Sequence, residues 1–392
     1  MKIVIFGLAI TSSWGNGHGT TYRSLCKALA RRGHRIEFVE KDLEWYRNNR
    51  DLPHPDFCTV HMYDDWEASR RSFLRLTKDA DVVVIGSYFP DAIAATNELV
   101  NAGRGPLVFY DIDTPITIER LRAEGKTSYL EAAQIPHFAA YLSFTGGPIL
   151  HELEERFGAR CALPFYCSVD PELYRPTHRR EAFRCDMSYL GTYASDRQPK
   201  LMQLLNHPAT MLPQSRFIVA GAQYPKTEAW APNVERIVHL SPPEHPVFYC
   251  SSRFTLNLTR DSMVAAGYSP SVRLFEASAC GATILSDPWS GLEQFLTPGR
   301  EVLLPKDAYE VAEILRNFPD EERVRIGLNA RERVLEQHTA SHRALEFEEM
   351  VERCCSGTRP RASGDDKEMP LRSHTPSPSG RSARSSSPVQ VQ

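Results

Sequence analysis

The stretch KIVIFGLAITSSWGNGHGTTYRSLCKALARRGHRIEFVE, residues 2–40, decides the fold class. It begins with an apolar run, KIVIF, and ends with a second one, RIEFVE at 35–40. Between the two runs, apolar side chains follow the spacing of one helix face: Tyr22, Leu25, Cys26 and Leu29. Gly33 then stands where a helix commonly ends. The stretch therefore predicts a strand, a helix and a second strand, which is the repeating unit of a parallel α/β sheet.

Further apolar runs of strand length follow along the chain. They lie at 81–86, 106–111 and 139–144, and they restart after the proline-flanked segment 163–176 at 187–191, 216–221, 253–259, 282–287 and 301–305. Helical patterns lie between many of them and at about 320–338 and 341–353. We therefore predict two doubly wound α/β domains with parallel sheets, residues 1–168 and 169–355. In such open sheets, ligands bind at the carboxyl ends of the strands.

Composition limits the class of protein. The 392 residues carry a formal net charge of −3, so nucleic acid is not expected as a partner. No run approaches the roughly 18 apolar residues of a membrane span, and no signal peptide is expected. Nine scattered cysteines without a CxxC pair predict a cytoplasmic location with reduced thiols. Residues 356–392, with nine serines and five prolines, predict a disordered tail.

The loop SSWGNGHGTTYR, residues 12–23, contains three alternating glycines: Gly15, Gly17 and Gly19. Glu40 suits the acidic residue of a dinucleotide site, but a loop of about a dozen residues is too long for that tight turn. The lysine of a P-loop is also missing. A flexible surface turn and an active-site loop remain. In the active-site loop, His18 serves as a general base or orients a substrate hydroxyl.

A second constellation lies in YSPSVRLFEASACGATILSD, residues 268–287. A helix start near Ser271 offers free N–H groups and a positive dipole end, and Arg273 adds a planar donor. Glu276, one turn further along, can accept two hydrogen bonds from a ribose diol. Together these groups describe a site for a nucleotide sugar. The simpler alternative is a surface salt bridge between Arg273 and Glu276.

The chain resembles the GT-B glycosyltransferases. The segment SPSVRLFEASACGATILSDPWSGLEQFLTPGREVLL resembles their donor-binding segment. YLGTYASDRQPKL, FYDIDTPIT and SSWGNGHGTTYR are similar to the spore-maturation CgeB-like branch. The resemblance spans most of residues 1–345. It implies two Rossmann-like domains facing a cleft, with the nucleotide-sugar donor in the C-terminal domain and the acceptor near the N-terminal one.

The resemblance also implies roles for particular residues. Glu276 matches the carboxylate that holds the donor ribose, and His18 matches the loop that faces the acceptor and the transferred sugar. Arg260 and Arg273 lie near the expected diphosphate, as does the helix start at Ser271. Gly191 and Thr192 match the loop that contacts donor phosphate. Many retaining members carry a second Glu eight positions before the ribose Glu. Tyr268 occupies that position here, which leaves retention or inversion open.

The pair Asp111 and Asp113 in DID follows an apolar strand. If the strand stays extended, both carboxylates face one way and could chelate a metal. The GT-B resemblance instead implies that neither a metal nor another cofactor is required. Asp113 could hydrogen-bond or activate the acceptor, or it could only cap the turn before Pro115.

Histidine and aromatic residues offer weaker signals. His338 and His342 have the i, i+4 spacing of zinc ligands, but no Glu follows His338 as in HExxH, and a structural role is expected. Tyr193 and Trp289 could stack on a base or sugar, although core packing is the default for a single aromatic residue.

The sequence therefore predicts a glycosyltransferase, hexosyltransferase-like, that transfers a sugar from a nucleoside-diphosphate sugar to an acceptor hydroxyl. His18 or Asp113 would act on the acceptor. Two alternatives stay open: a non-catalytic binding protein of the same fold, and an NAD(P)- or FAD-dependent oxidoreductase that uses the glycine loop and Glu40.

Overall fold

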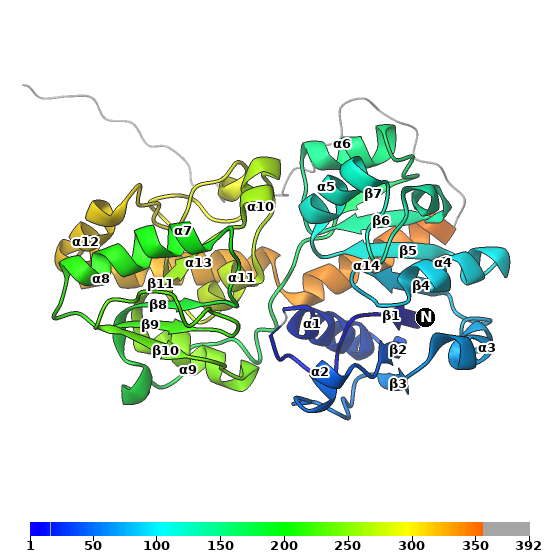
Figure 1. Cartoon of the computed structure of the whole chain (residues 1–392), viewed down its shortest axis with the longest axis horizontal. Coiled ribbons are helices and arrows are strands. Elements are labelled where there is room, and N and C mark those ends of the chain that lie inside the picture. Colours follow the sequence, from blue (N-terminus) through cyan, green and yellow to red (C-terminus); the bar gives the residue numbers. More distant parts are fainter. Residues whose placement is uncertain (16, 356–392) are drawn as a thin grey trace, which may run out of the picture. The chain divides into compact units, whose positions relative to one another are not determined.

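The computed structural model describes residues 1–15 and 17–355. The predicted tail, 356–392, lies outside the described residues. The first sheet has seven parallel strands in the order β3-β2-β1-β4-β5-β6-β7 (Figure 1). Their bounds are β1 (Lys2–Phe6), β2 (Arg35–Lys41), β3 (Thr59–Tyr63), β4 (Val82–Gly86), β5 (Leu107–Asp111), β6 (Ala140–Ser143) and β7 (Ala162–Pro164).

Six helices accompany the first sheet. They are α1 (His18–Arg31), α2 (Glu44–Arg47), α3 (Trp66–Leu76), α4 (Ala92–Asn101), α5 (Thr114–Glu124) and α6 (Pro148–Glu155), with a short 3-10 helix η1 (Ala132–His137). Strand β1 shows why both faces are covered. Its Ile3 and Ile5 join the core cluster that contains α1, and its Val4 and Phe6 join the cluster that contains α3 and α4. Continuous apolar runs thus bury both faces of a parallel sheet.

The second sheet has five parallel strands in the order β10-β9-β8-β11-β12. Their bounds are β8 (Cys185–Leu190), β9 (Phe217–Ala220), β10 (Val234–Ile237), β11 (Ser252–Asn257) and β12 (Thr283–Ser286). Around it lie α7 (Gln198–Leu201), η3 (Met202–Asn206), α8 (His207–Met211), α9 (His245–Ser251), α10 (Asp261–Ala266), α11 (Val272–Ala279), α12 (Ala308–Asn317) and α13 (Asp320–Gln337). Three further short 3-10 helices are η2 (Glu181–Phe183), η4 (Pro242–Glu244) and η5 (Leu292–Gln294).

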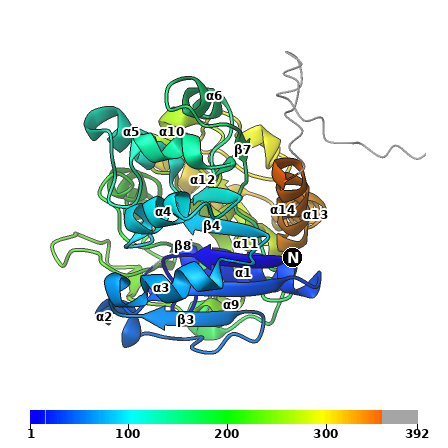
Figure 2. The ribbon, with the colours of Figure 1, turned by 90° about the vertical axis from the view of Figure 1, so that its right-hand side faces the viewer.

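The last described helix, α14 (Ala340–Cys355), packs against α1 of the first sheet (Figures 1 and 2). Arg32 donates to the carboxylate of Glu348 with two hydrogen bonds of 2.7 Å. Phe347 of α14 lies 6.2 Å from the ring of Phe165. Helix α14 thus returns to the first sheet, whereas α13 packs against α11 and β12 of the second.

Most strand predictions hold, with four exceptions. Strands β3, β7 and β10 are not predicted by the sequence because their runs are short or only partly buried, for instance TVHMY at 59–63. The predicted strand at 301–305 is wrong: it forms only a bridge between Leu303 and Leu285. The helix predicted from the apolar face Tyr22–Leu29 begins at His18. No described helix combines the length and apolar character needed to cross a bilayer.

The glycine loop is held firmly by backbone and side-chain contacts. Asp51 accepts hydrogen bonds from the backbone N–H of Ser13 at 2.9 Å and from its hydroxyl at 2.8 Å. Gly15 has a φ of +68°, which favours glycine. A Cβ at Gly19 would lie 2.7 Å from the backbone oxygen of Ser12, whereas one at Gly17 would meet nothing within 4 Å. These contacts hold the two ends of the loop, at Ser13 and Gly19.

Substituting Gly19 by Ala is expected to destabilise the protein, because the new methyl group has no room beside Ser12. Overpacking of this kind costs about 1–3 kcal/mol. On helix propensity alone, Ala in α1 would instead stabilise by about 1 kcal/mol. Chemical unfolding of Gly19→Ala, with Gly17→Ala as the comparison, measures whether the free energy of unfolding falls or rises. A Gly19→Ala protein as stable as Gly17→Ala would contradict the close approach.

Candidate active site

Three side chains meet at the carboxyl ends of neighbouring strands in the first sheet. His18 begins α1 after β1, Tyr88 follows β4, and Asp113 precedes α5 after β5. The rings of His18 and Tyr88 lie 5.2 Å apart, edge to face at 89°. Tyr88 has a φ of 63°, which is rare for a non-glycine residue, and its hydroxyl bonds Asp113. The structure thus brings the predicted His18 and Asp113 together and adds Tyr88, which sequence reasoning missed.

Burial sets the protonation state of this cluster. The pKa of His18 is lowered by desolvation, and the negative charge of Asp113 opposes that effect only in part. The imidazole is therefore neutral at pH 7. Its Nδ1 is buried without a hydrogen-bond partner among the described residues. A neutral imidazole beside a carboxylate can accept a proton and hold the resulting charge.

Asp111 and Asp113 do not share one extended strand, which the chelating alternative required. Strand β5 ends at Asp111, and Asp113 already lies at the N-cap of α5. The carboxylate of Asp111 is fully buried and accepts hydrogen bonds from Tyr141 at 2.5 Å and Thr117 at 3.0 Å. Desolvation raises the pKa of Asp111 to about 6. Its role is to tie β5 to β6 and α5.

Glu40 is bonded to the two residues that lead into the glycine loop, Ile10 and Thr11. Its Oε2 accepts from the backbone N–H groups of Ile10 at 2.7 Å and Thr11 at 3.0 Å, and its Oε1 accepts from the Thr11 hydroxyl at 2.5 Å. The carboxylate has no exposed surface. Glu40 shapes the loop, and this arrangement argues against its use as the ribose ligand of a dinucleotide site.

In the second sheet, Asn257 joins the start of α11 to the strands. At the end of β11, its Oδ1 accepts from the Ser271 hydroxyl at 2.6 Å and from Nη1 of Arg273 at 3.1 Å. Its Nδ2 donates to Ser286 of β12 at 2.9 Å. The structure thus brings Ser271 and Arg273 together through a residue that the sequence analysis missed. The run TLNLT looked like an ordinary buried strand, so Asn257 carried no signal.

Arg273 lies beneath the predicted phosphate loop. Its Nε donates to the backbone oxygen of Leu190, and its guanidinium stands 4.8 Å from the ring centre of Tyr189. A Cβ at Gly191 would approach Nη2 of Arg273 to 2.6 Å. Any larger residue at 191 would therefore have to displace the buried guanidinium of Arg273 or the hydroxyl of Tyr189. Arg273 and Glu276 form no direct salt bridge, so the simpler reading of that pair does not hold.

Glu276 is 6% exposed and faces two tyrosines. Desolvation raises the pKa of its carboxyl to about 7, although the charge of Arg273 and a hydrogen bond from Tyr249 act to lower it. A chain of hydrogen bonds from Leu240 through His245 and Tyr174 explains how a protonated Glu276 is accommodated. Burial lowers the pKa of His245 to about 4, so this ring is neutral. Its Nε2 faces the oxygen of Leu240 at 3.1 Å and must donate there.

The other ring nitrogen of His245 must then accept. Its Nδ1 lies 3.1 Å from the Tyr174 hydroxyl, so Tyr174 donates to it. The hydroxyl of Tyr174 has no second proton for Glu276. A protonated Glu276 can donate to Tyr174 and complete the relay, which agrees with the raised pKa of the carboxyl.

Arg260 is held in an ion pair rather than free. Its Nε donates to Asp196 at 3.2 Å. Two further cations stand in the same loops and were missed. Arg197 donates to the backbone oxygen of Thr192 at 2.7 Å, and Lys200 contacts Asp261 at 2.9 Å and Asp287 at 3.3 Å. The spacing of cations in TYASDRQPK was the available signal. Together they make a charged rim at the ends of β8, β11 and β12.

The remaining candidates are structural. His338 ends α13 and accepts from Arg343 at 2.9 Å, whereas His342 lies in α14, so the two do not share a continuous helix. Trp289 is buried against Phe295. Tyr193 packs 5.5 Å from the ring of Tyr224. Across residues 1–15 and 17–355, no group of three or more His, Cys, Asp or Glu side chains could hold a metal ion.

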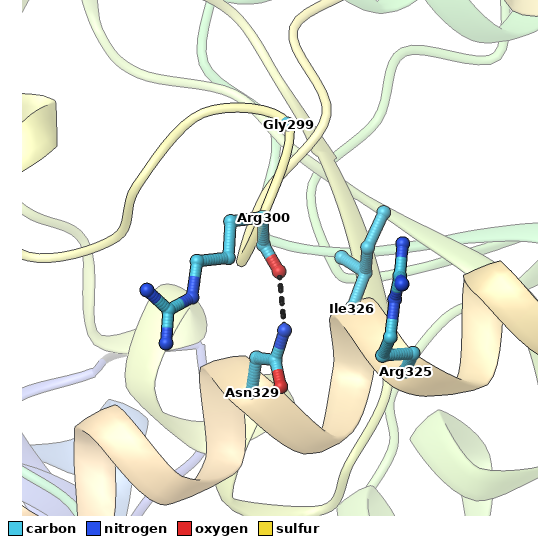
Figure 3. A pocket seen from close by; sticks show the side chains of 5 residues that line it. All are labelled: Gly299, Arg300, Arg325, Ile326 and Asn329. Atoms are coloured by element: carbon cyan, nitrogen blue, oxygen red, sulfur yellow. Dashed lines mark hydrogen bonds between the residues drawn. The ribbon is translucent and has the colours of Figure 1, made fainter. Parts of the chain in front are cut away.

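A pocket of about 270 Å³ lies away from all these residues (Figure 3). It is lined by Gly299, Arg300, Arg325, Ile326 and Asn329. Nδ2 of Asn329 donates to the backbone oxygen of Arg300 at 3.1 Å, and Arg325 pairs with Glu322. The two arginine side chains extend in different directions in Figure 3 and do not converge on one point.

Comparisons with known proteins agree with this geometry. Residues 197–349 match the family model described as glycosyl transferase-like, which includes α11 and the charged rim. No curated protein matches the sequence significantly.

Solved structures show the fold. Sucrose-phosphate synthase (tll1590) from Thermosynechococcus elongatus is similar, with a TM-score of 0.67 and 14% identity over 91% of this chain and 100% of that chain. Anabaena Alr3699/HepE in complex with UDP-glucose has a TM-score of 0.67 and 12% identity over 90% and 99%. An alpha-glucosyltransferase in complex with UDP-glucose and DNA containing an abasic site has a TM-score of 0.64 and 14% identity over 90% and 98%. With its two all-parallel sheets, the chain has the GT-B fold.

The raised pKa of Glu276 predicts a pH dependence of stability. The folded state binds this proton more tightly than the unfolded chain, whose carboxyl has a pKa near 4.5. The associated stability is fully present below pH 4.5 and is lost as the pH rises through about 7. At about 1.4 kcal/mol per unit, the loss is on the order of 3 kcal/mol.

Glu276→Gln keeps a neutral side chain that can donate to Tyr174, so it should remove this part of the dependence. Urea unfolding of both proteins between pH 4.5 and 8 gives the difference in free energy of unfolding. A difference that does not change with pH would show that Glu276 is ionised throughout.

Proposed function

We propose that the protein is a glycosyltransferase that transfers a sugar from a nucleoside-diphosphate sugar to an acceptor hydroxyl. The observation that carries the proposal is the start of α11, where Ser271 and Arg273 are bonded to the carboxyl ends of β8 and β11 and the buried Glu276 follows one turn later, near Arg273. The match of this segment to a glycosyl transferase-like family model supports it. The UDP-glucose bound in two structures of the same fold favours a uridine nucleotide and a hexose.

On the donor side, the Glu276 carboxylate would accept the two ribose hydroxyls. The diphosphate would meet the loop Gly191–Thr192 and the cations of the charged rim, Arg197, Lys200 and Arg260. Lys200 is now paired with Asp261 and Asp287 and Arg260 with Asp196, so the leaving group would exchange partners with these two cations. Fixed positive charge of this kind stabilises a developing phosphate charge, and the proposal requires no divalent metal.

On the acceptor side, neutral His18 would take the proton of the acceptor hydroxyl as its oxygen bonds to the sugar carbon and the diphosphate departs. Asp113 would stabilise the imidazolium that forms, since its charge already acts on His18. A cytoplasmic location and membership of the CgeB-like branch belong to the same proposal. The alternative is a binding protein without turnover, which the substitution of Glu by Tyr268 favours.

A panel of UDP, GDP, ADP, dTDP and CMP, each with Mg²⁺ or EDTA, tests the donor site. One nucleotide should raise the melting temperature of the wild type equally in both media. Glu276→Ala should weaken the binding free energy of that nucleotide by about 1.5–3 kcal/mol, the usual contribution of hydrogen bonds to a charged group.

Glu332→Ala, at an exposed position of α13, is the matched control and should bind as the wild type does. Stabilisation that survives in Glu276→Ala, or that needs Mg²⁺, would overturn the donor-site assignment.

His18→Asn tests the acceptor side. Release of nucleoside diphosphate from the sugar nucleotide chosen by the panel should fall by about 10²–10⁴ when a general base is lost. The nucleotide-induced rise in melting temperature should persist, because His18 lies on the first sheet. His137→Asn, exposed in η1, controls for the loss of an imidazole. If His18→Asn releases nucleoside diphosphate at a near-normal rate, Asp113 takes the role of general base instead. If the wild type releases none, the non-catalytic alternative is favoured.

A further inference from the structure

Tyr268 has an unusual backbone conformation. Its φ is 49°, in the left-handed region that non-glycine residues rarely adopt, and Gly267 before it has a φ of 68°. The segment leads directly into α11, whose residues form the candidate donor site. Such a conformation persists only where the surroundings hold it in place.

The ring of Tyr268 lies between two glycines from different sheets. A Cβ at Gly147, which lies between β6 and α6 in the first sheet's half of the chain, would lie 2.3 Å from Cδ2 of the ring. A Cβ at Gly291, which follows β12 of the second sheet, would lie 2.3 Å from Cδ1. Both glycines have positive φ values. A side chain at either Gly147 or Gly291 would therefore collide with the ring of Tyr268.

Hydrogen bonds repeat this connection. The backbone oxygen of Tyr268 accepts from the N–H of Gly146 at 2.9 Å, and its own N–H donates to Ser290 at 2.6 Å. The hydroxyl groups of Ser269 and Thr145 lie 2.8 Å apart and are both buried. One short segment is thus bonded to the loop after β6 and to the loop after β12.

We propose that Tyr268 is a positioning residue that pins the loop 145–147 of the first sheet to the start of α11. The inference rests on the proposed function, because its consequence is the spacing between the acceptor-side pair, His18 and Asp113, and the donor-side Glu276. Many retaining GT-B glycosyltransferases carry a glutamate at the position of Tyr268. In this chain, Gly147 and Gly291 cover the two edges of the Tyr268 ring. Its contribution to transfer is alignment rather than contact with the sugar.

The experiment compares Tyr268→Ala and Tyr268→Phe in the full chain, with Tyr309→Ala, exposed on α12, as the control. Three quantities are measured: hydrogen exchange in the peptides covering 144–148 and 268–272, nucleotide affinity by calorimetry, and release of nucleoside diphosphate. Tyr268→Ala should speed exchange in both peptides and lower kcat by about tenfold or more, as misaligned reacting groups do. Nucleotide affinity should stay at the wild-type value, and Tyr268→Phe should behave as the wild type.

Other results would overturn the proposal. Wild-type exchange and kcat in Tyr268→Ala would show that the ring pins nothing. Loss of nucleotide affinity in parallel with kcat would make Tyr268 a donor ligand. A gain of activity in Tyr268→Glu would show that the position still serves a carboxylate.

Two further measurements distinguish the failure of this proposal from a folding defect and from the failure of the proposed function. If Tyr268→Ala fails to fold, Thr145→Val removes one hydrogen bond of the same contact at nearly constant volume and should speed exchange in the same two peptides. If the wild type binds no nucleotide, the proposed function fails, and the exchange measurements still decide whether the ring pins the two loops.

Discussion

The candidate donor site depends on one buried cation. Arg273 is bonded to the oxygen of Leu190 and to Asn257, and it lies against the ring of Tyr189. A buried guanidinium is tolerated only when its donors are satisfied, so the ends of β8 and β11 must hold their acceptors in place. The same requirement keeps Gly191 free of a side chain. The loop that would meet a diphosphate is thus shaped from below by a charge that is itself fixed by the sheet.

A second constraint comes from carboxyl groups that are kept away from water. Glu276 and Asp111 both have raised pKa values through desolvation, yet their surroundings differ. Asp111 receives hydrogen bonds from Tyr141 and Thr117 and only joins structural elements. Glu276 depends on a relay through Tyr174 that favours its protonated form. A ligand whose hydroxyls donate to Glu276 would reverse that preference, so binding and proton release at this position are linked.

Sequence reasoning reached the fold because the decisive signals were local. Apolar runs such as KIVIF and the helix face from Tyr22 to Leu29 report burial on both sides of a parallel sheet. Edge strands gave no such signal: β3 and β10 expose side chains that blur the pattern. At the site, residue types such as His18, Arg273 and Glu276 were informative. Their partners were not, because Asn257, Tyr88 and Lys200 act through contacts between segments far apart in sequence.

The return of α14 to the first sheet has a consequence for how the chain acquires its structure. Arg32 and Glu348 are separated by 316 residues, and the surface of α1 beside them is completed only by the last described helix. During synthesis the first sheet emerges early, but one of its apolar faces stays partly uncovered until residues 340–355 leave the ribosome. Contacts of such long range slow folding and leave apolar surface open to chaperones. The first half of the chain therefore cannot complete its folding independently, before the last described helix has been synthesised.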